Sequence, residues 1–325
     1  MKDNNALIIL GMHRSGTSLL TGLLSQVGVK MGRRLYAPQK GVNDKGFWEH
    51  EDIVDAHDEL LLHLGSQWDD LLPLGNEWWK ADVVRPFADR LMSLVRRDFS
   101  NTYVWALKDP RMCRLLPLWF PLFSSQHISP TFICMNRNPF EVVASLQKRD
   151  GFSQEKALVL WLSHSLSAER YSRGKPRIFI DFDQVVENPA EALLRIEQKA
   201  SLVFPVSATE ASKKIKSFVS PDLRHHKADG TPKPMHAGIS LMAYKLYRAF
   251  NEMTAGNVGS YEFIDRIAAD FLAYQSKWNP ELVEQIRYLN QERADYRIKF
   301  FQIYKSWSWL LAKPLWLVEK RLRKY

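Results

Sequence analysis

The sequence predicts an α/β fold in which a parallel sheet carries helices on both faces and a helical extension follows at the C-terminal end. Four short apolar runs have the length and the Ile, Val, Phe and Leu content of buried strands: Ala6–Leu10, Tyr103–Leu107, Thr131–Met135 and Arg177–Phe182. Helical patterns separate these runs, among them Ser18–Val27, Phe140–Lys148 and Glu155–Arg173. Strands that alternate with helices form βαβ units, which build a parallel sheet.

The C-terminal part of the chain has a different pattern. Residues Ser220–His236 are rich in Pro, Gly, His and Lys and are typical of a loop. Helical patterns follow at Ile239–Thr254 and Tyr261–Lys277, and Pro280 opens a polar helix, Glu281–Arg297, whose weak apolar stripe suits a short coiled coil or a docking helix. We therefore expect a main domain over residues 1–235, a helical extension over 236–280, and a polar helix with a tail over 281–325.

Charge and cysteine content narrow the function class. The net charge is +9, but residues 297–325 hold eight Lys or Arg against one Glu, which leaves +2 for the other 296 residues. The positive charge therefore does not predict a nucleic-acid partner. The two cysteines, Cys113 and Cys134, offer no disulfide framework and no metal-ligand spacing, so we expect no metal and a reducing, cytoplasmic location. The N-terminal apolar run is too short for a signal peptide, and no stretch of about 18 apolar residues predicts a membrane span.

The first motif follows the first predicted strand. Residues 11–18 read G-M-H-R-S-G-T-S, which has the G-x-x-x-x-G spacing of a P-loop and predicts a P-loop-like sheet. Gly11 and Gly16 permit a tight loop whose N–H groups, with the start of the next helix, hold an anion. Nucleotide kinases place a Lys after the second Gly, whereas here that position is Thr17 and the cation is Arg14 within the loop. A loop of this kind suits a donor with a single 5′-phosphate group.

The second motif follows the third predicted strand. Residues 135–145 read M-N-R-N-P-F-E-V-V-A-S, which puts Arg137 at the carboxyl end of the strand and Pro139 in the first turn of a helix. Ser145 lies about two turns into that helix and can face the same anion as Arg137. Ligands of open α/β sheets bind beyond the carboxyl ends of the strands, so the two motifs can share one crevice. Two phosphate sites in one crevice indicate a nucleotide with phosphates at both ends of its ribose.

Together the two motifs resemble the donor site of sulfotransferases that use 3′-phosphoadenosine 5′-phosphosulfate (PAPS). The likeness is to bacterial members and, more distantly, to tyrosylprotein and heparan sulfotransferases, and it extends over about residues 5–225. The resemblance implies that the 5′-phosphosulfate is held by one run of residues: Arg14, Ser15, Gly16, Thr17 and Ser18. It implies that Arg137 and Ser145 hold the 3′-phosphate. The expected activity is transfer of the sulfuryl group to a hydroxyl or an amine.

Two further segments are candidates for catalysis. Residues 46–50 read G-F-W-E-H, and an apolar setting favours Glu49 as a general base, with His50 as the alternative. The matching segment of tyrosylprotein sulfotransferases carries the catalytic Glu. Residues 107–111 read L-K-D-P-R, and Lys108 resembles the family lysine that contacts the transferring sulfate. A charged K-D-P-R directly after a buried strand serves either a site or a buried ion pair, and Asp109 can orient Lys108 or Arg111.

The last candidates lie in the C-terminal half. Arg224, in the basic loop, is a candidate to close over the nucleotide or the acceptor. The aromatic and basic segment 297–325 is typical of a helix that lies on anionic lipid, and it also resembles endings of bacterial enzymes of surface-glycan assembly. A dimer contact or a poorly ordered end is the alternative. We therefore expect a glycan or lipid-linked glycan acceptor and a peripheral contact with the inner face of the membrane. A P-loop kinase and a non-catalytic membrane-docked scaffold remain the competing functions.

Overall fold

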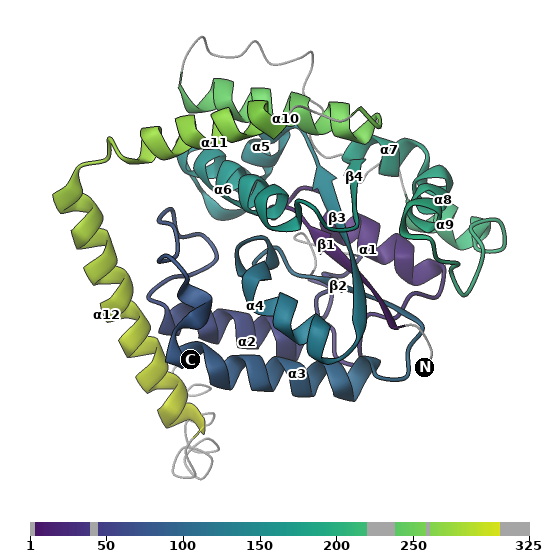
Figure 1. Ribbon diagram of the computed structural model, residues 1–325, viewed down its shortest axis with the longest axis horizontal. Coiled ribbons are helices and arrows are strands. Elements are labelled where there is room, and N and C mark those ends of the chain that lie inside the picture. The colour runs from purple at the N-terminus through teal and green to yellow at the C-terminus, as the bar shows by residue number, and fades with distance from the viewer. Residues whose placement is uncertain (1–3, 40–44, 220–237, 258–260, 306–325) are drawn as a thin grey trace, which may run out of the picture.

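The computed structural model describes residues 4–39, 45–219, 238–257 and 261–305. At its centre is a parallel sheet of four strands in the order β2-β1-β3-β4 (Figure 1). The strands are β1 Asn4–Leu10, β2 Val104–Lys108, β3 Ile128–Asn136 and β4 Arg177–Asp181. All four predicted strands are present, and the predicted parallel α/β fold is confirmed.

The central strand β1 is buried on both faces. Ala6, Ile8 and Leu10 point into one apolar core, and Leu7 and Ile9 point into another, on the opposite side of the sheet. A strand covered on both faces needs apolar residues at every position, which is why β1 reads as a continuous apolar run.

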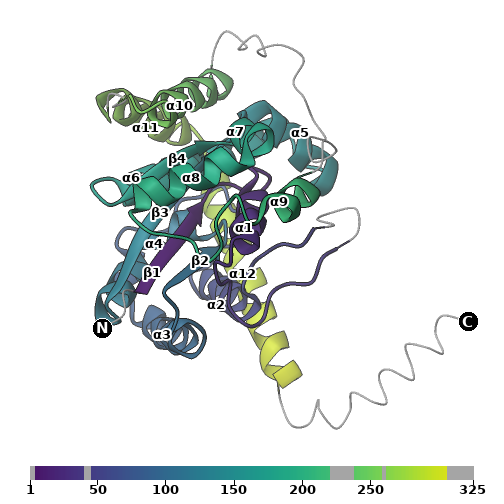
Figure 2. The same ribbon diagram turned by 90° about the vertical axis from the view of Figure 1, so that its right-hand side faces the viewer.

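Helices cover both faces of the sheet, as predicted (Figures 1 and 2). One face packs against α2 Glu51–His63, α3 Arg85–Phe99, α4 Met112–Ser125, α5 Pro139–Asp150 and α6 Gln154–Ser172. The other face packs against α1 Thr17–Gln26, α7 Phe182–Glu187, α8 Pro189–Ala200 and α9 Ser212–Phe218. Two short 3₁₀ turns, Trp78–Lys80 and Asp82–Val84, precede α3.

The helices α10 Ile239–Thr254 and α11 Tyr261–Gln275 pack against each other, and α10 also lies on α6 and β4 (Figure 1). Leu246, Phe250 and Ile264 are buried in the same core as α2 to α6. The helical extension expected over residues 236–280 therefore shares the hydrophobic core of the main domain. The predicted loop, Ser220–His236, lies outside the described residues.

The last described helix, α12 Pro280–Lys305, runs along the edge of the molecule and contacts α2 (Figure 1). Its start is capped by Asn279, whose side-chain oxygen accepts a hydrogen bond from the backbone N–H of Glu281 at 2.9 Å. Most of the basic aromatic tail, residues 306–325, lies outside the described residues. Within the described part of the chain, no helix has both the length and the apolar character needed to cross a bilayer.

Candidate active site

The predicted anion-binding segments meet at one edge of the sheet. Because β1 lies between β2 and β3, the carboxyl ends of these three parallel strands are neighbours. The chain leaves β1 into the glycine loop, ends β2 at Lys108, and reaches Arg137 directly after β3. The topology therefore brings together three segments that lie far apart in the sequence (Figure 1).

The loop after β1 has the tight geometry that its glycines predict. Gly16 has a φ of 88°, and a Cβ at this position would lie 2.3 Å from the ring of Phe182. Arg14 also adopts a left-handed conformation, with a φ of 69°. The hydroxyl oxygen of Ser15 is buried and makes no hydrogen bond with any described residue. Such a hydroxyl fits a loop that receives the oxygen atoms of a phosphosulfate.

The second motif folds as predicted. Asn138 caps α5, because its side-chain oxygen accepts a hydrogen bond from the N–H of Phe140 at 3.0 Å, and Pro139 occupies the first turn. This start fixes the position of Ser145, which is buried two turns further along α5.

The two motifs are in direct contact. Arg14 donates a hydrogen bond from Nε to the hydroxyl of Ser145 at 2.7 Å, and Arg137 donates from Nη1 to the carbonyl oxygen of Arg14 at 2.9 Å. Arg137 also pairs with Glu141 at 3.1 Å and stacks over the ring of Phe182, 4.0 Å from its centre. Burial, and then the positive charges of nearby arginines, lowers the pKa of Arg14 from its ordinary value. The cations at this edge are therefore close enough to face one multiply charged anion.

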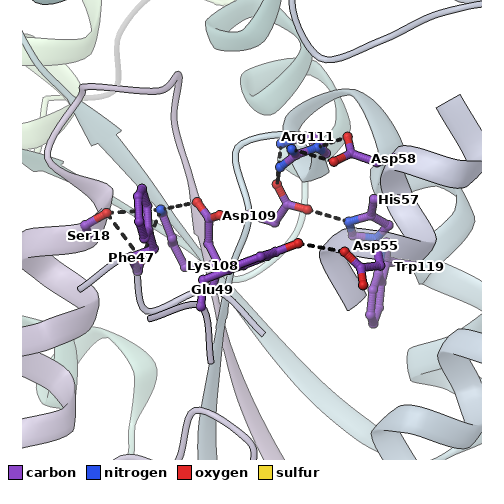
Figure 3. A network of polar contacts seen from close by, with 11 residues as sticks. Ser18, Phe47, Glu49, Asp55, His57, Asp58, Lys108, Asp109, Arg111 and Trp119 are labelled. Atoms are coloured by element: carbon purple, nitrogen blue, oxygen red, sulfur yellow. Dashed lines mark hydrogen bonds and ion pairs between the residues drawn. The ribbon is translucent and has the colours of Figure 1, made fainter. Parts of the chain in front are cut away.

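Glu49 and Lys108 form a buried ion pair at the same edge. The distance from Lys108 Nζ to Glu49 Oε1 is 2.5 Å, and the two side chains are only 4% and 9% exposed. Lys108 also donates to the hydroxyl of Ser18 at 3.1 Å and to the carbonyl of Phe47 at 3.2 Å, as Figure 3 shows. Lys108 thus links the Glu49 carboxylate to the first turn of α1. The immediate neighbour of the Glu49 carboxylate is a cation, whereas the sequence alone indicated an apolar setting.

The residue before Glu49 holds an uncommon conformation. Trp48 has a φ of 57°, which is left-handed and strained for a large side chain, and its ring packs edge-on against Phe218 at 6.1 Å. This bend directs Glu49 toward Lys108. No sequence pattern predicts this conformation.

Asp109 and Arg111 belong to a buried network behind Lys108 (Figure 3). Asp109 accepts from His57 Nδ1 at 2.7 Å and from Arg111 Nη1 at 2.9 Å, and Arg111 also binds Asp58. Burial alone would raise the pKa of Asp109, but the charge of Arg111 and the hydrogen bond from His57 hold that pKa far below its ordinary value. Within the K-D-P-R segment, Asp109 and Arg111 therefore form a buried ion pair. Lys108 lies beside Glu49 and Ser18, and its role in catalysis stays a prediction.

The network also fixes the ring of His57. The indole N–H of Trp119 can only donate, and it lies 3.0 Å from His57 Nε2. His57 Nε2 therefore accepts, and the ring proton on Nδ1 points at Asp109. This arrangement holds α2 and α4 together beside the end of β2.

The structure gives His50 different surroundings from Glu49. Its Nε2 lies 2.7 Å from Asp98 Oδ2, and both side chains are fully buried. The ring also lies close to Gly32, where a Cβ would approach the imidazole to 2.4 Å. His50 Nε2 is thus tied to α3, whereas His50 Nδ1 is buried and makes no hydrogen bond with any described residue. The choice between Glu49 and His50 as the base stays a prediction. Arg224 lies outside the described residues.

His13 is a residue of this edge that the sequence analysis did not single out. Its Nε2 is buried without a hydrogen bond to any described residue, and its ring centre lies 4.5 Å from that of Trp68. Burial, followed by the positive charges of Arg111 and Arg149, lowers the pKa of His13 well below its ordinary value. A neutral imidazole with an unpartnered nitrogen can accept a proton. Its position inside the glycine loop is the sequence signal that points to it.

No protein-family model matches this sequence, and no curated protein matches it. Three solved structures resemble the chain at low TM-scores. The first is "Sulfotransferase Domain from the Synechococcus PCC 7002 Olefin Synthase", with a TM-score of 0.42, 19% identity, and coverage of 77% of this chain and 95% of that one. The second is sulfotransferase STF9 from Mycobacterium avium, with a TM-score of 0.42, 17% identity, and coverage of 84% and 77%. The third is "Sulfotransferase Domain from the Curacin Biosynthetic Pathway", with a TM-score of 0.34, 15% identity, and coverage of 84% and 99%.

All three are sulfotransferases. The two sequence motifs resemble the same family. At these TM-scores the likeness is distant, so the assignment of residues to roles depends on the geometry of the chain itself.

Proposed function

We propose that this chain is a sulfotransferase that moves the sulfuryl group of PAPS to a hydroxyl or an amine. The observation that carries the proposal is the direct contact of Arg137 with Arg14, and of Arg14 with Ser145. Two motifs that separately suit a 5′-phosphosulfate and a 3′-phosphate thus meet at one sheet edge, within reach of a single nucleotide.

In this proposal the glycine loop binds the 5′ end of the donor. Ser15, whose hydroxyl is buried without a partner, and the first turn of α1, with Thr17 and Ser18, supply hydrogen-bond donors. Arg137 and Ser145 bind the 3′-phosphate. When PAPS binds, Arg14 exchanges its hydrogen bond with Ser145 for one to the 5′-phosphosulfate, because an anionic oxygen attracts a guanidinium more strongly than a neutral hydroxyl does.

The proposed chemistry uses the Glu49–Lys108 pair. Glu49 takes the proton of the acceptor hydroxyl, the acceptor oxygen forms a bond to sulfur, and the bond from sulfur to the bridging phosphate oxygen breaks. Lys108 stabilises the negative charge that develops on the bridging oxygen, and 3′,5′-ADP leaves. The ion pair of the free protein therefore opens when the donor binds, which releases the Glu49 carboxylate. His50 and His13 are the other candidates for the base, because His50 Nδ1 and His13 Nε2 are buried and make no hydrogen bond with any described residue.

For the acceptor, we propose a cell-surface carbohydrate, either free or linked to a lipid. This proposal depends on the likeness of the tail to enzymes of surface-glycan assembly and on the basic and aromatic residues of segment 297–325, which suit contact with anionic lipid. A cytoplasmic location agrees with the two unpaired, buried thiols; burial raises the pKa of the Cys134 thiol to about 11.

Transfer of radiolabelled sulfate from PAPS to candidate glycans tests the activity. Product that depends on both PAPS and the acceptor supports the proposal, and its absence across hydroxyl and amine acceptors contradicts it. The competing kinase function predicts stronger thermal stabilisation by ATP with Mg²⁺ than by 3′,5′-ADP, and Thr17 in place of the kinase lysine counts against it. The scaffold alternative predicts that pure protein binds neither nucleotide.

A further inference from the structure

The helix α12 carries an exposed apolar row with regular spacing. Six large apolar side chains are between 41% and 66% exposed: Leu282, Ile286, Leu289, Tyr296, Phe300 and Ile303. Together with Arg293, which lies between Leu289 and Tyr296, they follow one another at intervals of four and three residues in alternation. We name these seven residues the α12 seam. This spacing averages 3.5 residues, which is the repeat of a coiled coil and differs from the 3.6 of a helix packed on a globular core.

A different face of α12 holds the helix on the domain. Ala294 is only 1% exposed, and α12 contacts α2. The approach is close, because a Cβ on Gly65 at the end of α2 would lie 2.7 Å from the side chain of Gln291. The seam therefore lies on the outer side of a helix that is anchored to the domain. Figure 1 shows that this helix runs along the edge of the molecule.

The seam borders a groove of about 620 Å³, lined by Leu289, Glu292, Arg293, Tyr296, Arg297 and Phe300. Arg293 Nε is buried there and makes no hydrogen bond with any described residue. The exposed apolar side chains form one surface and indicate a partner that supplies apolar contacts.

We propose that α12 pairs with α12 of a second copy of this chain, as an antiparallel two-stranded coiled coil related by a two-fold axis. A coiled-coil seam is self-complementary, so a second copy is the partner that the spacing itself specifies. From Leu282 to Ile303 the seam spans three heptads, or about 32 Å of helix. This proposal is independent of the enzymatic function.

Arg293 decides the orientation. In a parallel pair the two Arg293 side chains would face each other in the core, where like charges repel. In an antiparallel pair, a register that places Arg293 opposite Tyr296 of the second copy gives a cation–π contact in its place. The same register places Glu292 beside Lys299 of the second copy, and the two-fold axis repeats both contacts.

Analytical ultracentrifugation of the full chain tests the pairing. The expected wild-type species has twice the 37.8 kDa mass of the chain at micromolar concentration. Leu289→Asp, in the seam and 50% exposed, is expected to weaken dimerisation at least tenfold. Tyr288→Asp, on the same helix, 62% exposed and outside the seam, is the matched control and is expected to leave the dimer intact. Circular dichroism checks that both variants fold. A wild-type chain that stays monomeric at about 100 µM, or an intact Leu289→Asp dimer, overturns the proposal.

Charge exchange tests the orientation. Glu292→Lys is expected to weaken the dimer, and the double variant Glu292→Lys/Lys299→Glu to restore it, because the antiparallel pair regains opposite charges. In a parallel pair Glu292 lies beside Arg297 of the second copy. The antiparallel arrangement is therefore overturned if Glu292→Lys/Arg297→Glu restores the dimer and Glu292→Lys/Lys299→Glu does not.

Discussion

Arg137 donates a hydrogen bond from Nη1 to the backbone carbonyl oxygen of Arg14 across 2.9 Å. The two residues are 123 positions apart in the chain and follow two neighbouring strands. This contact joins the glycine loop to the segment that leads into α5, so the two motifs lie side by side in one site.

Glu49→Gln is expected to lower the rate of sulfate transfer by about 10²- to 10⁴-fold, because the amide cannot take the acceptor proton. Lys108→Ala is expected to lower it as well, through loss of charge stabilisation on the leaving oxygen. The measurement is single-turnover transfer from labelled PAPS. Glu51→Gln, at a carboxylate that pairs with Arg34 on the surface at 3.0 Å, is the control and is expected to leave the rate unchanged. Full transfer by Glu49→Gln together with loss of transfer by His13→Gln would make His13 the base.

Ser15→Ala is expected to leave the stability of the free protein unchanged, because the hydroxyl makes no described hydrogen bond to lose. The same change is expected to weaken PAPS binding tenfold or more, because a hydrogen bond to a charged group is lost. Ser25→Ala, which removes a hydroxyl bonded to the carbonyl of Gly22 at 2.7 Å, is the control and is expected to leave the affinity unchanged. Urea unfolding and calorimetric titration separate the two effects. An unchanged affinity for Ser15→Ala would remove Ser15 from the donor site.

Asp109→Asn is expected to destabilise the fold by about 3 to 5 kcal/mol, because it removes the charge of the fully buried partner of Arg111 and leaves only Asp58, whose side chain is 42% exposed. Asp265→Asn serves as the control. It breaks a surface ion pair with Arg173, in which the Asp265 side chain is 57% exposed. Its urea midpoint is expected to move far less, because exposed ion pairs contribute little. Equal shifts in the two variants would show that the network behind Lys108 does not stabilise the fold.

Asp181→Asn tests a pH dependence. Burial raises the pKa of Asp181 to about 6, above the 3.8 expected when the chain is unfolded. The folded state therefore holds this proton more tightly, so Asp181 costs stability progressively as the pH rises from about 4 to 6. Asn keeps an oxygen to cap α7, where Asp181 accepts from the N–H of Asp183 at 2.8 Å.

Above pH 6, the free energy of unfolding of Asp181→Asn is expected to exceed that of the wild type by roughly 1 to 2 kcal/mol, a figure reduced for partial solvent screening. Near pH 4 the two free energies are expected to converge. Urea unfolding across this range measures the difference. A difference that does not change with pH would contradict the raised pKa.

The backbone of the site could be predicted from the sequence. Continuous apolar runs identify strands that are buried on both faces, and the Asn138-Pro139 pair predicts where α5 begins. Both signals are local. The parallel order then follows from the alternation of strands and helices, so the sequence also predicts that Arg14 and Arg137 share an edge.

The side-chain partners could not be predicted in the same way. Glu49 meets Lys108 only because the chain between α1 and α2 bends at Trp48, and His50 meets Asp98 because α3 packs beside that bend. The link from His57 to Asp109 likewise depends on how α2 lies against the end of β2. Such contacts arise from tertiary packing, which leaves no periodic pattern in the sequence.

The affinity for 3′,5′-ADP relative to 5′-AMP, measured by calorimetry on the wild type and on Arg137→Ala, tests the central claim most directly. The account predicts that the wild type prefers 3′,5′-ADP at least tenfold, since a guanidinium–phosphate contact is a strong charge-assisted hydrogen bond, and that Arg137→Ala binds both nucleotides equally. A wild type without this preference, or an Arg137→Ala variant that keeps it, would contradict a 3′-phosphate site at Arg137.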